Sequence, residues 1–159
     1  MLNVKLELAT LIVLGALIGP LAAQEGHSLM VVDADGEEHV LSLDALDSME
    51  QVEFSTTTIW TEGKVQFSGV PVMSILAAFE AEGTTLQMSA LNDYKVEMPI
   101  ADLRQDLPIV ATRMNGQTMS VREKGPYWIV YPFDRSPEYR TEVTYAQSVW
   151  QLTALAVMD

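Results

Sequence analysis

The chain lacks cysteine altogether and has few basic residues and only two histidines among its 159 residues. Without cysteine it can form no disulfide, no thiolate nucleophile and no cysteine-ligated zinc or iron–sulfur centre. Only 9 lysines and arginines stand against 22 acidic residues, which gives a formal net charge of -13. Nucleic acids and anionic lipids both require a basic surface, so neither is an expected partner.

Common catalytic motifs are missing as well. No serine lies in a G-x-S-x-G context, and the chain has neither a G-x-G-x-x-G segment nor a P-loop. His27 and His39 are too few for most histidine-based metal sites, and no metal site is expected. The acidic residues show no spacing that nominates a pair for acid–base catalysis. These absences favour a binding protein over an enzyme.

The longest apolar run lies at the N-terminus. Lys5 precedes an uncharged apolar stretch from Leu8 to Ile18, and the segment ends in two small residues, Ala22 and Ala23. This pattern is typical of a secretory signal peptide over residues 1–23, with cleavage near Ala23. The run is short for a membrane span of about 20 residues, although an uncleaved anchor remains the alternative. We expect residues 24–159 to form a single soluble domain in the bacterial periplasm.

Residues 24–159 carry many short extended segments and few helices. Two turn signals, Asp35-Gly36 and Asn115-Gly116, indicate hairpins. The Asp33-x-Asp35-Gly36 segment is interpreted as a turn, since it lacks the closing ligands of a calcium loop. A run of aromatic and branched residues at 127–131 predicts a central strand. Predicted strands cover residues 28–32, 38–42, 51–60, 65–67, 85–90, 94–98, 109–114, 127–131 and 149–157, and predicted helices cover 43–49, 71–82, 99–106 and 141–148. The fold class is therefore α+β.

Aromatic and polar residues gather at the ends of these predicted strands. Together they suit a pocket for a flat, nitrogen-rich ring. Such a ring needs an aromatic face, a carboxylate for an amino-pyrimidine edge and an arginine for a carbonyl. Core packing of the tryptophans and a turn role for Asp93 remain alternatives. The candidates are Trp60, Asp93, Tyr94, Arg113, Tyr131, Arg135 and Trp150.

Five motifs occur in a fixed order between residues 67 and 152, within a match that runs from about residue 38 to residue 157. They are Phe-Ser-Gly-Val-Pro-Val at 67–72, Leu-Asn-Asp-Tyr at 91–94 before Met98-Pro99, Met-Asn-Gly-Gln at 114–117, Lys-Gly-Pro-Tyr-Trp-Ile-Val-Tyr-Pro at 124–132, and Ser-Val-Trp-Gln-Leu at 148–152. In this order they resemble the sulfite-oxidase-type molybdopterin-binding domain. The resemblance implies a mixed α+β fold with curled, partly barrel-like sheets.

One departure from this family decides the expected chemistry. Its enzymes hold molybdenum through a cysteine on the strand before the Gly-Val-Pro helix, whereas residues 54–60 here read Phe-Ser-Thr-Thr-Thr-Ile-Trp. Threonine is a poor replacement for a soft thiolate. The chain is also shorter than the catalytic domains and has few basic residues to bind a pyrophosphate. Molybdenum is therefore not expected.

The resemblance is strongest to compact periplasmic pterin-binding proteins that act as sensory partners. It implies a non-metallated pterin as ligand and, as partner, the periplasmic domain of an inner-membrane enzyme that makes or degrades cyclic di-GMP and so affects biofilm formation. Trp60 and Tyr131 would supply ring faces, Asp93 would bind the amino-pyrimidine edge, and Arg135 would bind the carbonyl edge. Tyr94, Arg113 and Trp150 are second choices.

Two alternatives stay open. One is a small molybdopterin-dependent oxidoreductase, or a subunit of one, with an unusual metal ligand. The other is a protein-interaction domain whose vestigial pocket is packed shut by Trp60 and Trp150.

Overall fold

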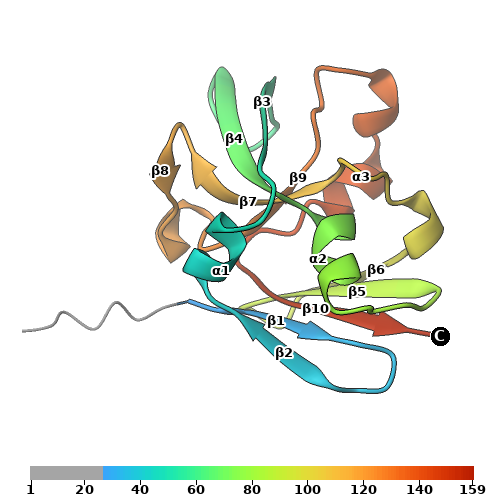
Figure 1. Ribbon diagram of the computed structural model, residues 1–159. Coiled ribbons are helices and arrows are strands. Elements are labelled where there is room, and N and C mark those ends of the chain that lie inside the picture. Colours follow the sequence, from blue (N-terminus) through green and yellow to red (C-terminus); the bar gives the residue numbers. More distant parts are fainter. Residues whose placement is uncertain (1–26) are drawn as a thin grey trace, which may run out of the picture.

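The computed structural model describes residues 27–159, which form two β-sheets with short helices between and around them (Figure 1). The expected signal peptide at residues 1–23 lies outside the described residues. Within residues 27–159, no helix has both the length and the apolar character needed to cross a membrane.

The first sheet contains five strands in the order β2-β1-β10-β5-β6. Its neighbouring strands are antiparallel except β1 and β10, whose parallel pairing joins the first and last strands of the described chain. The predicted hairpin at Asp35-Gly36 is confirmed, with Gly36 at a φ of 84°. The strands are β1 (Leu29–Val32), β2 (Glu38–Leu41), β5 (Thr85–Ala90), β6 (Lys95–Pro99) and β10 (Leu152–Met158).

The second sheet has the order β3-β4-β7-β8, and β9 pairs with β7 as well. All of its pairs are antiparallel. The β7–β8 hairpin turns at Asn115-Gly116, as the sequence predicts. The strands are β3 (Val52–Thr57), β4 (Lys64–Pro71), β7 (Ile109–Met114), β8 (Gln117–Thr118) and β9 (Trp128–Val130).

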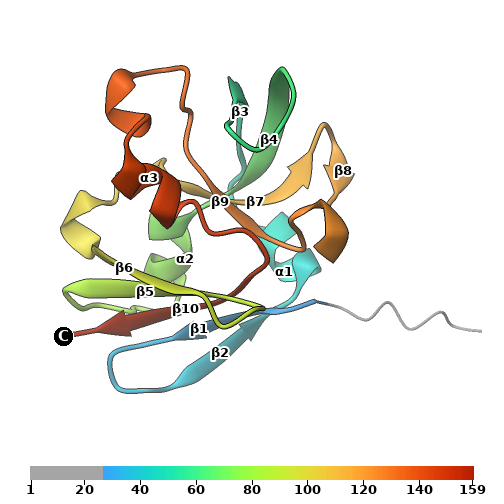
Figure 2. The same cartoon turned by 180° about the vertical axis from the view of Figure 1, so that it is seen from behind.

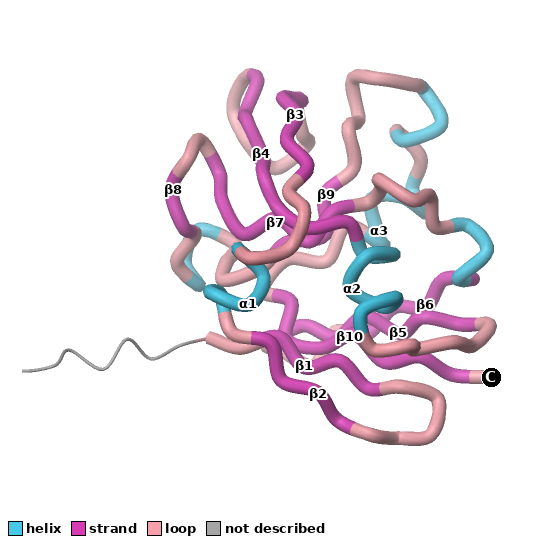
Figure 3. The backbone as a smooth tube through the Cα atoms, viewed as in Figure 1, coloured by secondary structure: helices cyan, strands magenta, loops and turns pink. Residues whose placement is uncertain are grey.

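Short helices connect the strands, and Figure 3 shows how little of the chain they occupy. Helix α2 follows β4 directly and buries Val72, Ile75 and Leu76, which lie on one helical face. Ser42 and Thr141 cap α1 and α3, since each side chain accepts a hydrogen bond from a backbone N–H of the first turn. The helices are α1 (Leu43–Asp47), α2 (Val72–Ala78), α3 (Glu142–Gln147) and the 3-10 turns η1 (Ile100–Asp102), η2 (Val121–Glu123) and η3 (Pro137–Tyr139).

The α+β class is confirmed, but several predicted boundaries are wrong. Strand β4 extends to Pro71, which therefore caps α2 instead of occupying its first turn. The predicted helix 71–82 ends at Ala78, because Glu80 adopts a φ of 50°. The last strand begins at Leu152, because Gln151 adopts a φ of 51°. The predicted helix 99–106 is only one 3-10 turn.

Two predicted strands also differ in extent or position. The strand predicted at 51–60 ends at Thr57, because the Thr58 hydroxyl accepts a hydrogen bond from the Trp60 N–H and bends the chain. The sequence predicts that segment 127–131 is central in its sheet. β9 instead pairs with β7 alone among the strands and spans three residues. Its residues are nonetheless fully buried, so the apolar pattern reflects burial by packing.

Gly69 lies where β4 crosses β7 most closely. A Cβ atom at this position would lie 2.0 Å from the Val110 carbonyl oxygen and 2.7 Å from the Ala111 Cα. The pairing register of β4 and β7 shifts between Ser68 and Gly69, which marks a bulge at the same point. Only glycine fits because both obstructing atoms belong to the backbone. This contact explains the glycine of the Gly-Val-Pro motif.

We therefore expect Gly69→Ala to lower the free energy of unfolding by about 2 kcal/mol or more, the order seen for overpacked cores. Urea unfolding followed by tryptophan fluorescence measures the change. Gly36→Ala is the matched control, because its Cβ would meet no atom within 4 Å and only its φ of 84° opposes alanine. That control is expected to lose about 1 kcal/mol. Equal losses in the two variants would contradict the close approach of β4 and β7.

Candidate functional site

A cluster of aromatic rings surrounds Trp60 at the start of the β3–β4 loop. The Trp60 ring makes edge-to-face contacts with Trp150, Tyr145 and Trp128, with ring centroids 5.4, 5.7 and 5.8 Å apart. Phe133 follows at 6.1 Å. Such T-shaped contacts stabilise aromatic pairs beyond the burial of their area. The cluster connects the loop to the core, since Trp128 is fully buried.

A cavity of about 310 Å³ opens beside this cluster. Its lining residues come from the end of β5, the β3–β4 loop, the β5–β6 turn, α3 and the segment between α3 and β10. Figure 2 shows where these elements lie in the fold. We call it the aromatic cleft. The residues that line it are Trp60, Ala90, Asn92, Tyr94, Tyr145, Ala146, Ser148, Val149 and Trp150.

Backbone and side-chain contacts hold the two indoles of the cleft in place. The Trp60 N–H donates to the Thr58 hydroxyl oxygen at 3.0 Å. Trp150 forms an isolated β-bridge with Trp128. The Lys124 ammonium lies 4.7 Å from the centroid of the Trp150 ring, a cation–π distance. Both rings are only partly buried, so they retain surface for a ligand.

The β5–β6 turn supplies the polar wall of the cleft. The Tyr94 hydroxyl donates to the Ala146 carbonyl at 3.1 Å and so ties this turn to α3. The Asn92 side chain accepts from the Tyr94 N–H at 3.2 Å, so Asn92 makes the Asx turn. Asp93 lies between these two lining residues with a φ of 64°, and its side chain forms no hydrogen bond or ion pair with the described residues. Asp93 is exposed and does not itself line the cavity.

Three of the seven predicted site residues line the cleft: Trp60, Tyr94 and Trp150. Asp93 adjoins it, and the other three lie elsewhere. The Tyr131 hydroxyl is buried and lies 3.4 Å from Gln147 Oε1, and burial raises the pKa of this phenol above its usual range. Tyr131 therefore packs in the core.

The two predicted arginines do not line the cleft. Arg113 on β7 donates to both carboxylate oxygens of Asp47, at 2.5 and 2.7 Å. These hydrogen bonds lower the pKa of the Asp47 carboxyl, so the guanidinium is committed to a structural pair. Arg135 is exposed and lies 4.0 Å from Asp106 Oδ2.

Sequence reasoning missed Asn92, Tyr145 and Ser148 as lining residues. Tyr145 and Ser148 fall within the predicted helix 141–148, but no pattern there distinguishes a cleft-facing ring from a surface ring. Ser148 is buried, and its hydroxyl donates to the Thr144 carbonyl at 2.7 Å. Its carbonyl accepts from Trp128 Nε1 at 3.2 Å, which fixes the floor of the cleft. Of these three residues, only Asn92 could have been chosen from the sequence, because it is next to the predicted site residue Asp93.

A clasp between two distant segments holds the end of β3. The Asp134 carboxylate accepts from the Thr57 hydroxyl at 2.5 Å and from the Thr57 N–H at 2.8 Å. The Asp134 N–H in turn donates to the Thr56 hydroxyl at 3.0 Å. The hydrogen bonds from Thr57 lower the pKa of the Asp134 carboxyl. This clasp fixes the strand end from which the Trp60 loop departs.

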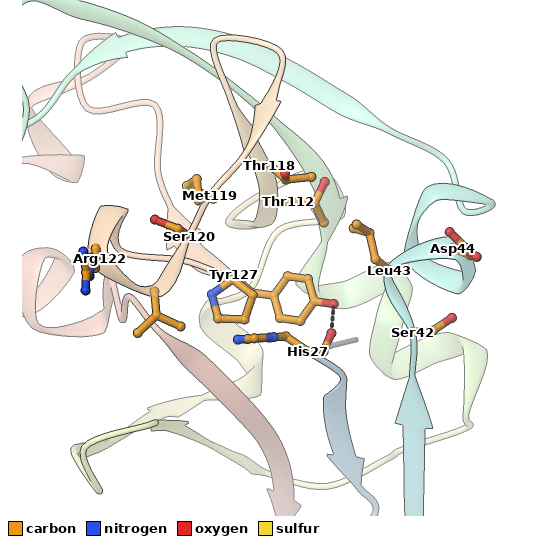
Figure 4. A pocket seen from close by; sticks show the side chains of 12 residues that line it. His27, Ser42, Leu43, Asp44, Thr112, Thr118, Met119, Ser120, Arg122 and Tyr127 are labelled. Atoms are coloured by element: carbon orange, nitrogen blue, oxygen red, sulfur yellow. Dashed lines mark hydrogen bonds between the residues drawn. The ribbon is translucent and has the colours of Figure 1, made fainter. Parts of the chain in front are cut away.

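A second, larger cavity of about 690 Å³ lies between α1 and the β8–η2 segment. Figure 4 shows Tyr127 at its centre, with its hydroxyl donating to the His27 carbonyl at 2.6 Å. Burial raises the pKa of Tyr127 to about 12, so the phenol stays neutral. Asp44 and Arg122 line the cavity on opposite sides of Tyr127. The Tyr127 hydroxyl proton is already donated to the His27 carbonyl, so it is not available to a ligand.

A third group of polar residues lies in the β1–β2 hairpin. Asp33, Glu37 and His39 place their ligand-type atoms within 4.8 Å of one another. The Asp33 carboxylate accepts from the Glu37 N–H at 2.9 Å, and His39 Nε2 lies 3.4 Å from its other oxygen. The His39 ring also stacks on Phe79 at 4.5 Å. These contacts account for the group as a hairpin turn, in line with the sequence interpretation.

We expect Asp134→Asn to lower thermal stability at neutral pH, because the amide loses the charge that Thr57 stabilises. A carboxyl whose folded-state pKa is lowered stabilises the fold above its unfolded pKa. That contribution is lost as pH falls through the folded pKa. The difference in melting temperature between wild type and variant should therefore shrink with falling pH. Melting curves from pH 7 to pH 2 measure it.

The control for this experiment is Glu62→Gln, which removes an exposed carboxylate that has no hydrogen bond to the described residues. Its melting temperature should stay within about a degree of wild type, as for most surface substitutions. A pH-independent difference for Asp134→Asn would show that the clasp does not depend on charge.

Comparison with known proteins supports the fold and identifies the family. The chain is similar in structure to the sulfane dehydrogenase SoxCD from Paracoccus pantotrophus, with a TM-score of 0.61 and 19% sequence identity. The match covers 84% of this chain and 38% of that chain, so this protein spans well under half of its length. No curated protein sequence matches the chain. The family described as oxidoreductase molybdopterin binding domain matches residues 18–133, more than half of the chain. The protein therefore belongs to the oxidoreductase molybdopterin-binding domain family.

Proposed function

We propose that the protein binds a pterin ring in the aromatic cleft and acts as a non-catalytic ligand sensor. The observation that carries the proposal is the cleft itself, which presents Trp60 and Trp150 within a cavity of about 310 Å³. Small-molecule sites range from about 300 to 1,000 Å³, so this one suits a single bicyclic ring without a long tail. A pocket packed shut by the same tryptophans would have favoured the vestigial alternative.

The cleft offers aromatic faces for a pterin, and Asp93 adjoins it in the chain, but neither predicted arginine lines it. The partly exposed indoles of Trp60 and Trp150 provide faces on which a flat ring stacks, a contact of about 1–3 kcal/mol per ring. The unpaired Asp93 carboxylate beside the cleft suits the amino-amide edge, because it can accept two parallel N–H bonds. Tyr94 and Tyr145 supply further apolar surface.

A molybdenum ion does not fit the residues at the end of β3. The chain has no cysteine, and Thr56 and Thr57 engage their hydroxyls with Asp134 or the backbone. Hydroxyl oxygens are hard donors, unlike the thiolate that a soft site requires. The donor set is therefore wrong for the metal, and no redox step is assigned to it.

The sensory role and its location extend this proposal beyond ligand binding. The predicted signal peptide supports a periplasmic protein, and the lack of recognisable catalytic motifs supports a protein that reports a ligand without converting it. The partner would be the periplasmic domain of an inner-membrane enzyme of cyclic di-GMP metabolism. The support for this partner is the sequence resemblance alone.

We expect the purified domain to bind tetrahydropterins saturably at micromolar concentration, measured by isothermal titration calorimetry. Trp60→Ala should weaken binding by about tenfold or more, because a stacking face is lost. Asp93→Ala should also weaken it, through loss of charge-assisted hydrogen bonds. Arg135→Ala is the control, since Arg135 does not line the cleft, and its affinity should match wild type.

Three results would contradict the proposal. The first is the absence of saturable binding, and the second is an affinity in Trp60→Ala and Asp93→Ala equal to that of Arg135→Ala. The third is stoichiometric molybdenum in protein isolated from its native periplasm, which would favour the oxidoreductase alternative that the family name suggests.

A further inference from the structure

Three side chains that can bind a metal ion come together in the β1–β2 hairpin. Asp33, Glu37 and His39 each place one ligand-type atom within 4.8 Å of the other two. Asp33 directly follows β1, and His39 lies on β2 opposite Val31. β2 is one edge of the first sheet and β6 is the other (Figure 1). None of the three residues lines the aromatic cleft, so this group is separate from it.

The hairpin turn needs only part of this group. The Asp33 carbonyl accepts from the Gly36 N–H at 3.0 Å, and Asp33 Oδ1 accepts from the Glu37 N–H at 2.9 Å. The turn requires neither the Glu37 carboxylate nor the His39 imidazole. No lysine or arginine among residues 27–159 forms an ion pair with either carboxylate. Two neighbouring carboxylates repel each other, and a bound cation would relieve that repulsion.

The spacing of Asp33 and His39 suits a shared metal ion better than a direct hydrogen bond. His39 Nε2 lies 3.4 Å from Asp33 Oδ2. Most N–H···O hydrogen bonds are shorter, at about 2.7–3.2 Å. Zinc binds imidazole nitrogen and carboxylate oxygen at about 2.0–2.2 Å, so two such ligands at the tetrahedral angle lie about 3.4 Å apart. The two side chains are therefore already spaced as neighbouring ligands of one zinc ion.

Packing and hydrogen bonding hold these two ligands in place. The His39 ring stacks on Phe79, with ring centroids 4.5 Å apart and an angle of 19° between the planes. The side chains of His39 and Asp33 are only 22% and 16% exposed. The hydrogen bond from the Glu37 N–H lowers the pKa of the Asp33 carboxyl, which keeps it charged at neutral pH. The Glu37 side chain is exposed and can rotate to complete the set from the solvent side.

We propose that Asp33, Glu37 and His39 form a binding site for a divalent first-row transition-metal ion, with zinc as the best match. One imidazole nitrogen and two carboxylate oxygens supply three ligands, and water supplies the fourth. The imidazole disfavours calcium and magnesium, which prefer oxygen ligands. The ion would link β1 to β2 and stabilise this sheet edge. Two histidines alone predict no metal site, but the hairpin register brings two carboxylates to one of them.

Isothermal titration calorimetry with zinc chloride tests the site. The protein carries no histidine tag and is first stripped of metal with a chelator. We expect one equivalent of zinc to bind with a dissociation constant in the micromolar range or lower. Calcium and magnesium at millimolar concentration should not displace it, because the imidazole nitrogen suits neither ion.

Two substitutions remove a ligand and keep the contacts around it. Asp33→Asn retains an oxygen that accepts from the Glu37 N–H, and His39→Phe retains a ring against Phe79. Each should weaken zinc binding by about tenfold or more, since even the outer contacts of a metal site contribute about 10–100-fold. Glu38→Gln is the matched control. Glu38 is exposed on the same strand, and its side chain points to the opposite face from that of His39, so zinc affinity should match wild type.

Thermal melting provides a second measurement. Zinc should raise the melting temperature of wild type and of Glu38→Gln but not of His39→Phe, because only a folded site that binds the ion is stabilised. The absence of saturable zinc binding, undiminished binding in both ligand variants, or equal binding of calcium would overturn the site. So would an equal loss of affinity in His27→Gln, which replaces the other histidine. The site does not depend on the pterin proposal, so a failure to bind tetrahydropterins would leave it standing.

Discussion

The buried indole of Trp128 is the contact on which the cleft and much of the core depend. It lies on β9 and packs edge-on against Phe67 of β4, with ring centroids 5.3 Å apart, and against Trp60 at 5.8 Å. Its backbone bridges to Trp150, and its Nε1 donates to the Ser148 carbonyl. A single side chain thus positions the second sheet, the β3–β4 loop and the segment before β10. The Trp60 indole therefore packs against the Trp128 ring, and Trp150 is joined to Trp128 through the backbone bridge.

Much of the fold follows from local sequence signals. Asp35-Gly36 and Asn115-Gly116 fix two hairpins, because both glycines adopt positive φ. The boundaries that escaped prediction involve Glu80 and Gln151, which adopt positive φ without being glycine. Nothing in local propensity marks such residues, because tertiary contacts impose their conformations. The short α2 and the late start of β10 both follow from them.

Like the fold, the candidate site can be predicted from the sequence only in part. Trp60, Tyr94 and Trp150 come together because each lies just outside a strand, where side chains face a shared cavity. Tyr131 and Arg113 are also of residue types that suit a ring-binding pocket, but neither lines the cleft. Burial packs Tyr131 against Tyr139 at 5.8 Å, and Asp47 holds Arg113. Sequence position could not reveal these partners, since Asp47 lies 66 residues from Arg113.

The end of β3 is the place where this chain departs from the molybdenum enzymes that its sequence resembles. The enzymes that this sequence resembles hold molybdenum through a cysteine thiolate on this strand. This chain instead has Thr56 and Thr57, whose hydroxyls form hydrogen bonds with Asp134. The end of the strand therefore contributes to the stability of the fold. The neighbouring cleft does not need the metal to remain open, because Trp128 and the Tyr94–Ala146 hydrogen bond hold its walls. The hydroxyls at the end of β3 and the walls of the cleft are therefore held by separate contacts, and the pterin proposed for the cleft would need no donor from the strand end.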